Sequence, residues 1–338
     1  MDFARLATIS QKELSDHITS KRFLLILLIT CLVLGVAASN GVNNYNNSLE
    51  NYKNGQTGFL FFPSILEVFN EISNSFGIEG LGAIIGIAIG FDLISGEREG
   101  GSLKTMLSRP IYRDELINGK AIGGIITISI ITLTGFLTVV AIFLILGIVP
   151  NFDEVLLIGA IWLLTMLFMA YSFSLALMSS VIAKTSSGAL ILSLLIVLAL
   201  MYIIPIGGGE LGKSLILGSE PSENDYDLGS QLQSESFNNI QAGYDQKKVE
   251  IHDFFNMFSI KSVYNDIASA ITLPSNYVIT KKIGFINFAL NPDLAKNVEK
   301  PTIWEIIGDK WIKIIVFIMW PLMFFGIAYV RFMRMDLR

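Results

Sequence analysis

Long apolar runs separated by polar segments are the main feature of the chain. Six of the runs contain almost no ionised side chain, and a helix needs about 20 such residues to cross the hydrocarbon core of a bilayer. The pattern therefore predicts an all-α integral membrane protein with six membrane-spanning helices. The predicted spans are residues 22–39, 80–95, 119–148, 155–182, 188–206 and 312–332.

Two polar segments are long enough to carry structure of their own, 40–79 and 207–311. Within the second, residues 251–272 show the apolar periodicity of an amphipathic helix. The predicted organisation is a short N-terminal amphipathic segment at 1–21, spans one to five within 22–206, a separate domain at 207–311, and span six with a C-terminal tail at 312–338.

Composition places the chain in the same class. Of its 338 residues 52% are hydrophobic and only 16% are charged, whereas soluble domains carry about 25% charged residues. The single cysteine, Cys31, lies in the first apolar run, so no internal disulfide is possible. His252 has no second histidine and no cysteine in its segment, so no metal site is expected.

The basic residues indicate which side of the membrane each segment faces. Arginines occur at or before the start of span one, between spans two and three, and at or after the end of span six, and none occurs in 40–79 or 207–311. Cytoplasmic loops are enriched in Lys and Arg. Both termini and the loop 96–118 are therefore predicted to be cytoplasmic and the two long segments external, in the cytoplasmic membrane of a prokaryote.

The stretch GGGELGKS, residues 207–214, matches the G-x-x-x-x-G-K-[ST] pattern of a phosphate-binding loop. Such a loop follows a short buried strand and opens a helix within a βαβ unit. Here an apolar run of span length precedes the glycines, and polar turn-forming sequence follows them. We interpret the match as accidental and predict a flexible, glycine-rich exit from span five. The residues not expected to bind nucleotide are Gly207, Gly212, Lys213 and Ser214.

The loop between spans two and three carries the most informative sequence, GEREGGSLKTMLSRPIYRD. A glycine pair permits a sharp turn, and Ser102 is a suitable N-cap for a short helix over residues 103–108. Leu103, Met106 and Leu107 share one face of that helix. The residues alone leave two alternatives open: a helix that docks into a groove of another protein, or a loop that lies on the lipid headgroups.

This loop resembles the corresponding loop of permeases of the ABC-2 family, in which the string E-R-E-x-G-[ST]-L-x-x-L-L-S-x-P-x-x-R-x-x-x-x-G-K recurs; Met106 replaces a usual Leu. The residues that match are Glu97, Arg98, Glu99, Gly101, Ser102, Leu103, Leu107, Ser108, Pro110, Arg113, Gly119 and Lys120. Residues 1–21 also resemble that family's opening, where an amphipathic elbow helix precedes the first span. The residues on its apolar face are Phe3, Leu6, Ala7, Leu14 and Ile18, with Glu13 off that face.

The resemblance implies a division of labour. A permease of this family does no chemistry: two copies form the translocation pathway, and two separate ATPase subunits, which hold the ATP and the magnesium, dock on the cytoplasmic loops. It implies an export permease with no catalytic residue, cofactor, metal or nucleic-acid partner of its own. The residues expected to dock the ATPase are Glu97, Arg98, Glu99, Gly101, Ser102, Leu103, Met106, Leu107 and Arg113.

Ionisable residues inside a bilayer are costly, at about 3 kcal/mol each, and usually mark a functional pathway. The predicted spans contain no series of buried carboxylates, so a carrier driven by protons or sodium is disfavoured. Asp92, near the cytoplasmic end of span two, is expected to pair with an arginine of the loop. Two other classes stay open: a membrane-anchored structural or assembly protein with an external partner, and a stand-alone carrier or channel.

Two stripes of small residues complete the picture. Gly82, Gly86 and Gly90 repeat at helical spacing in span two, a pattern that permits close helix packing, either inside one subunit or across a dimer. In span three the stripe is Thr127, Thr134 and Thr138. Such hydroxyls either line a pathway or bond to carbonyls of their own helix.

Overall fold

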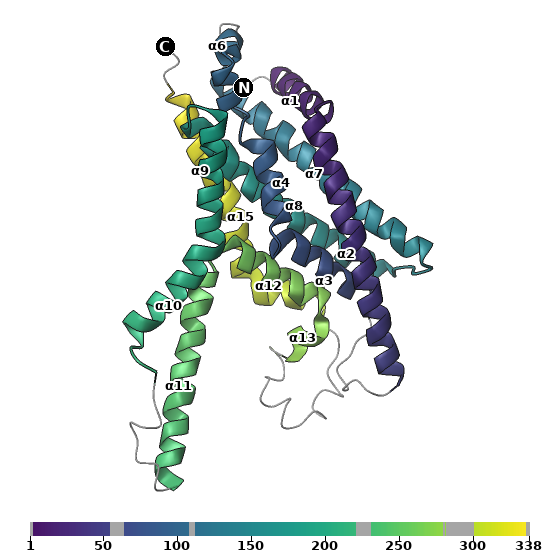
Figure 1. Ribbon diagram of the computed structural model, residues 1–338, viewed down its shortest axis with the longest axis vertical. Coiled ribbons are helices and arrows are strands. Elements are labelled where there is room, and N and C mark those ends of the chain that lie inside the picture. The colour runs from purple at the N-terminus through teal and green to yellow at the C-terminus, as the bar shows by residue number, and fades with distance from the viewer. Residues whose placement is uncertain are drawn as a thin grey trace. The chain divides into compact units, whose positions relative to one another are not determined.

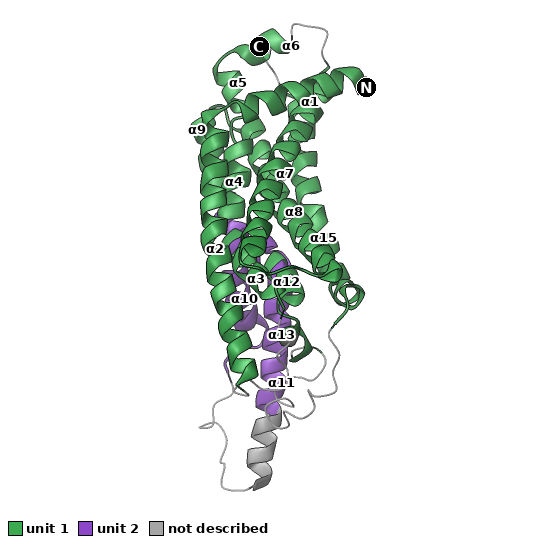
Figure 2. Cartoon of the chain, turned by 90° about the vertical axis from the view of Figure 1, so that its right-hand side faces the viewer, with its two compact units in different colours: residues 1–194, 264–338 green, residues 195–263 purple. Residues whose placement is uncertain are grey.

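The computed structural model describes residues 3–54, 64–107, 112–220, 231–279, 281 and 301–335. Every regular element among these residues is a helix, and none of them forms a strand, which confirms the predicted all-α class. The chain forms two compact units: unit 1, Met1–Leu194 with Tyr264–Arg338, and unit 2, Leu195–Val263 (Figure 2). The predicted domain 207–311 is therefore divided between the two units.

Figure 1 shows the helices in the order in which they follow one another along the chain. They are α1 (Phe3–Ile18), α2 (Lys21–Lys53), α3 (Leu66–Gly77), α4 (Leu81–Gly90), α5 (Ser95–Glu99), α6 (Ser102–Leu107), α7 (Arg113–Ile145), α8 (Phe152–Ile182), α9 (Ser186–Leu198), η1 (Ala199–Ile203), α10 (Ile204–Ile216), α11 (Gln231–Asn256), α12 (Ile260–Thr272), α13 (Pro274–Val278) and α15 (Ile303–Met333).

Within the part of the chain that the structure describes, five helices are long and apolar enough to cross a membrane: α2, α7, α8, the helix Ser186–Ile216 that contains α9, and α15. The pair Leu66–Gly77 and Leu81–Glu99, bent by 49°, makes a sixth crossing if it acts as one broken span. The structure thus has the predicted number of crossings when the pair is counted as one. The predicted span two, 80–95, corresponds to the second member of this pair, and the first member, α3, precedes the predicted span.

Several helices extend beyond the predicted spans. α2 continues past residue 39 to Lys53 and has 33 residues, which is about 50 Å at 1.5 Å per residue. The hydrocarbon core is only about 30 Å thick, so α2 is longer than a crossing requires. Part of the polar segment 40–79 is therefore a continuation of the first span and not a separate loop.

The break between α4 and α5 has a local cause. The backbone N–H groups of Ile94 and Ser95 donate to Oγ of Ser180, at 3.0 and 2.9 Å. An interrupted helix exposes N–H groups that need an acceptor, and the last turn of α8 supplies it. α8 thereby fixes the position at which α5 begins.

α4 packs closely on α8 through its three glycines. A Cβ added to Gly86 would lie 2.6 Å from the carbonyl oxygen of Met169, and one added to Gly90 would lie 2.8 Å from that of Phe173. At Gly82 the nearest atom is Cδ1 of Phe168, at 2.7 Å. No side chain fits in these spaces, so the glycine stripe serves packing within one subunit in this structure.

The threonines of α7 bond to their own helix. Thr127, Thr134 and Thr138 each donate to the carbonyl oxygen four residues earlier, at 2.8 to 2.9 Å. Thr127 is fully buried. These hydroxyls satisfy helix carbonyls, which was one of the two alternatives; a role of the stripe in a pathway stays a prediction.

An ion-pair cluster joins α12 to α15 within unit 1. The carboxylate of Asp266 accepts hydrogen bonds from the ammonium groups of Lys310, at 2.8 and 2.9 Å, and Lys313, at 2.6 Å. Burial alone would raise the pKa of Asp266, but the bonds to the two lysines outweigh it and hold that pKa below its usual value. The cluster fixes α12 against the last span.

In unit 2 the glycines of GGGELGKS lie within α10, and Gly208, Gly209 and Gly212 pack against α11. A Cβ at Gly209 would lie 2.5 Å from Nδ1 of His252, and one at Gly212 would lie 2.7 Å from Cε2 of Phe255. The prediction of a flexible exit from span five is therefore wrong, because the helix continues to Ile216. Close packing of two helices explains these glycines. That they bind no nucleotide is still a prediction.

A short π-helical segment, η1, precedes α10. Proline has no N–H to donate, so Pro205 leaves the carbonyl of Met201 without its usual partner. Oγ of Ser259 lies 3.5 Å from that carbonyl oxygen and donates to it. Ser259 lies between α11 and α12, so the helix predicted over 251–272 is interrupted there.

Candidate functional site

The loop that carries the family string lies at one end of unit 1. α5 and α6 lie near α1 and near both chain ends in both views (Figures 1 and 2). All arginines in the described part of the chain belong to this end's elements. They are Arg5, Arg22, Arg98, Arg113, Arg331 and Arg334. The site is built from the contacts that these elements make with the loop.

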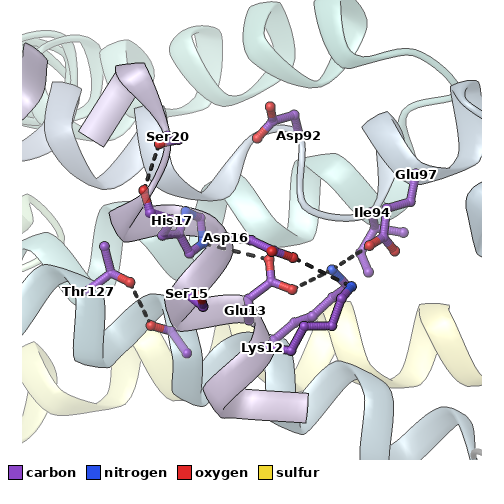
Figure 3. A network of polar contacts seen from close by, with 12 residues as sticks. Lys12, Glu13, Ser15, Asp16, His17, Ser20, Asp92, Ile94, Glu97 and Thr127 are labelled. Carbon is purple, nitrogen blue, oxygen red and sulfur yellow. Dashed lines mark hydrogen bonds and ion pairs between the residues drawn. The ribbon is translucent and has the colours of Figure 1, made fainter. Parts of the chain in front are cut away.

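A buried lysine joins three elements beneath the loop. Lys120 of α7 is 2% exposed, and its Nζ lies 2.8 Å from Oε2 of Glu13 in α1 and 2.8 Å from Oε1 of Glu97 in α5. Figure 3 labels the two carboxylates, Glu13 and Glu97. Two carboxylates around one buried ammonium compensate its loss of hydration. The charged group thereby ties the N-terminal helix, the loop and the third span together.

Arg98 caps the end of α8. Its Nη1 donates to the carbonyl oxygen of Ala183 and its Nη2 to that of Val181, each at 3.0 Å. Nη2 also lies 2.8 Å from Sδ of Met335. The last carbonyls of a helix lack partners within the helix and form the negative end of its dipole. A guanidinium with several donors is suited to bind them.

Glu99 acts on the next helix. Its Oε2 accepts a hydrogen bond from the backbone N–H of Ser186, the first residue of α9, at 3.0 Å. The start of a helix presents free N–H groups and the positive end of its dipole. Arg98 and Glu99 thus bind the helix ends on either side of the turn 183–185, and each carries a charge opposite to that of the helix end it binds.

Arg113 acts in the same way on the last span. Its Nη1 donates to the carbonyl oxygens of Met333 and Met335, at 3.1 and 2.7 Å, where α15 ends. Glu97, Arg98, Glu99 and Arg113 were all expected to contact an ATPase subunit. In this structure each of them contacts other parts of its own chain.

Asp92 pairs with a residue outside the loop. Its Oδ2 accepts a hydrogen bond from Nη1 of Arg22, at the start of α2, at 2.7 Å. Asp92 does not pair with the loop's Arg98, which binds the end of α8 instead; the loop's Arg109 lies outside the described residues. The same guanidinium of Arg22 lies over the ring of Phe91, 5.0 Å from its centroid.

α6 presents both an inner and an outer side. Leu103 is 1% exposed and therefore packs inside the chain, contrary to its expected place in a docking surface. Gly101, with φ of 73°, makes the turn that only glycine adopts readily, and Ser102 and Thr105 are exposed. Met106 is half-buried; the side chain of Leu107 lies outside the described residues.

Beside α6 is a groove of about 350 Å³ shared with α1 and α7. Its walls combine apolar and charged side chains, and one end meets the buried Lys120. The lining residues are Ile9, Lys12, Glu13, Ser102, Thr105, Met106, Leu116 and Lys120. We call this the α1–α6 groove.

α1 buries its polar side. Glu13 and Ser10 are buried against α7, where a Cβ added to Gly123 would lie 2.8 Å from Cβ of Glu13. Phe3, on the apolar face, is 85% exposed. Leu6 and Leu14 of that face are half-buried and line a hollow with Ile122 of α7. The exposed Phe3 is suited to lie in a membrane surface, and Glu13 serves the lysine cluster.

His17 lies at the edge of this cluster. Its Nε2 is 3.7 Å from Oε1 of Glu13 (Figure 3). Burial lowers the pKa of His17, an effect that the Lys120 and Arg22 charges reinforce and the Glu13 and Asp92 charges oppose. Among the described residues no group of three His, Cys, Asp or Glu side chains is placed to hold a metal ion.

The comparison with known proteins agrees with the family string. A model of the family described as "ABC-2 family transporter protein" matches residues 7–337. The chain belongs to the ABC-2 family. It is therefore the permease subunit of an ABC transporter, a multi-pass membrane component without catalytic activity that works with ATPase subunits.

Two relatives in the ABC-2 family carry the same printed name, "Probable ABC transporter permease protein NosY". The protein from Pseudomonas aeruginosa is 29% identical over 221 residues, which is 62% of this chain and 74% of the relative. The protein from Stutzerimonas stutzeri is 29% identical over 129 residues, or 38% of this chain and 41% of the relative.

Several residues of the site were not identified from the sequence. Lys120 was matched as part of the string, but its partners Glu13 and Glu97 lie on two other helices. Ser180 and Ser186 are ordinary polar residues in an apolar stretch, and nothing in their spacing marks them. A lysine at the start of an apolar run was the one available signal, because such a charge needs a partner.

Proposed function

We propose that this permease exports its substrate as one of two copies that form the pathway, and that it receives its drive from two ATPase subunits docked on the loop 96–118. The ATP and the magnesium are held by those subunits. The proposal rests on the observation that two parts of the loop make different contacts. Its charged residues hold helix ends of the bundle, while α6 presents an exposed side next to the α1–α6 groove.

The docking surface in this proposal differs from the one read from the sequence. It consists of the exposed side of α6 with Ser102 and Thr105, the half-buried Met106, and the groove residues Ile9 and Lys12 of α1. A short helix beside a partly apolar groove is suited to receive one or two side chains of a partner. The family resemblance supports export and pairing.

The orientation is part of the same proposal. The described arginines gather at the end of unit 1 that holds α6 and both chain ends, and arginine-rich ends face the cytoplasm. Single cysteines at Ser102 and at Ser214, both exposed, in a Cys31→Ser background should react with an impermeant thiol reagent from opposite sides of the membrane. Reaction of both from the outside would refute the orientation.

The docking surface is tested by placing bulky side chains on it. Ser102→Trp with Thr105→Trp adds bulk to the exposed side of α6 and is expected to prevent co-purification of the ATPase. Ser15→Trp is the matched control, because Ser15 is exposed on α1 and does not line the groove. Full retention of the ATPase by the double variant would contradict the proposal and favour a structural role for the loop.

A further inference from the structure

Arg98 and Glu99 contact the turn between α8 and α9 and not the exposed side of α6. Building on the proposed function, we infer that these two side chains are positioning residues that transmit displacement of the loop to the ends of α8 and α9. In this role they do not bind the ATPase. The residues of the family string E-R-E then connect α5 to α8 and α9 within the permease.

The geometry of Arg98 is that of a clamp on a helix end. Two of its nitrogens bind two different carbonyls, of Val181 and Ala183, at equal distances of 3.0 Å. Ala183 is the C-cap of α8. Two bonds from one planar group resist rotation as well as separation, so movement of α5 carries the end of α8 with it.

Glu99 supplies the second connection. The bond from its carboxylate to the N–H of Ser186 joins α5 to the first residue of α9. α9 begins the membrane-spanning helix Ser186–Ile216. A displacement at Ser186 along the helix axis is passed on along α9, because the backbone bonds of a helix make it stiff in that direction.

The attachment is reciprocal, which makes α5 and the turn 183–185 one body. Ser180 of α8 accepts the N–H groups of Ile94 and Ser95 at the start of α5, and its Oγ lies 3.1 Å from Oγ of Ser95. α5 is thus bonded to α8 at its first turn, and to α8 and α9 at its last. The glycine turn that follows links this body directly to α6.

The decisive variant is on the far side of the contact. Ser186→Pro removes the N–H group that donates to Glu99 and changes no residue of the loop. Proline is well tolerated at the first residue of a helix, where its missing N–H costs no helical bond. If Glu99 acts through Ser186, then Ser186→Pro and Glu99→Ala have the same effect, and the double variant is no worse than either.

The measurement uses the permease together with its ATPase. Spin labels on cysteines at Ser15 and Ile191, both exposed, in a Cys31→Ser background report the distance between α1 and α9. In the parent the distance distribution is expected to change when the complex is trapped with ATP and vanadate. In Glu99→Ala and in Ser186→Pro the trapped population is expected to fall by about tenfold, the equivalent of one charge-assisted bond.

Two conservative variants separate positioning from docking. Glu99→Gln keeps an oxygen that accepts from Ser186 and is expected to retain most of the change, whereas a docking role for the charge makes it as damaging as Glu99→Ala. Arg98→Lys keeps the charge but cannot bridge two carbonyls in one plane, so its trapped population is expected to fall.

The outcomes distinguish this inference from the proposed function. Co-purification of the ATPase with Glu99→Ala and Ser186→Pro is expected to match the parent. Release of the ATPase by Glu99→Ala but not by Ser186→Pro would overturn the inference and leave docking on the loop intact. An unchanged distance response in both variants would also overturn it. Failure of the ATPase to bind the parent at all would instead refute the proposed function.

Discussion

Lys120 of α7 donates to Glu13 of α1 across 2.8 Å, in a site where the lysine is 2% exposed. The bond joins residues that lie 107 positions apart, and the second carboxylate of the cluster, Glu97, comes from the loop. One ammonium therefore determines how the N-terminal helix sits against the loop. The first prediction concerns its loss.

Lys120→Met should strongly destabilise the permease, because it removes the ammonium that the buried Glu13 and the half-buried Glu97 share. Removing one partner of a buried charge cluster costs about 3–5 kcal/mol, which thermal unfolding in detergent can measure. Lys12→Met is the matched control: Lys12 pairs with Asp16 at the surface, and such pairs contribute little. Adding Glu13→Gln and Glu97→Gln to Lys120→Met should recover most of the loss. Equal melting temperatures for both lysine variants would contradict the cluster's role.

Gly86→Leu should separate α4 from α8. The nearest atom to an added Cβ is the backbone carbonyl of Met169 at 2.6 Å, which cannot move aside as a side chain does. Overpacking typically costs about 1–3 kcal/mol, and more where backbone must shift. Gly159→Leu is the control, since no atom lies within 4 Å of a Cβ at that position. Similar yields and melting temperatures for both variants would show that the helices do not pack as described.

His17 should make the stability of the permease depend on pH. Its pKa in the folded protein lies below 6.5 because burial disfavours the charged ring. Between that pKa and 6.5 the unfolded chain binds a proton that the folded chain does not, so stability should fall as the pH drops below about 6.5. The slope is at most about 1.4 kcal/mol per pH unit. His17→Gln should remove this component, and an unchanged slope in that variant would assign it to another group.

Lys213→Ala should leave nucleotide binding and hydrolysis by the assembled complex unchanged, because the helical glycines of GGGELGKS serve packing. Gly209→Leu should instead open the contact between α10 and α11, where His252 occupies the space of its side chain. Hydrogen exchange of α11 measures that opening. Loss of nucleotide binding by the isolated permease after Lys213→Ala would restore the phosphate-loop interpretation.

The class of the fold could be predicted because membrane spans are defined by composition over a long window. Two interruptions could not: the bend between α3 and α4, where Gly80 precedes α4 with φ of 81°, and the break between α4 and α5, where Ser180 of another helix accepts the free N–H groups. A bend of this kind is a property of two segments that are distant in the sequence. Apolar periodicity within one segment carries no information about it.

The sequence predicted where the site lies in the chain but not which groups its side chains contact. The string around Glu97 marked the right loop, and the charges suggested a partner subunit. The structure pairs Arg98 and Glu99 with backbone groups of α8 and α9, and backbone groups are the same at every residue. A sequence pattern cannot show which carbonyl or N–H a charge will find, so an internal connection and a docking surface look alike from the string alone.

The bond between Glu13 and Lys120 also sets an order of events during synthesis. α1 leaves the ribosome before α7, so the carboxylate of Glu13 can reach Lys120 only after the third span is made; until then the nearby ionisable group is His17 of its own helix, at 3.7 Å. At about 5–20 residues per second, the intervening 107 residues take on the order of 5–20 s. During that interval another contact has to hold α1, and the exposed Phe3 is suited to lie in the membrane surface. α1 therefore gains its bond to the bundle through Lys120 only once α7 has been inserted.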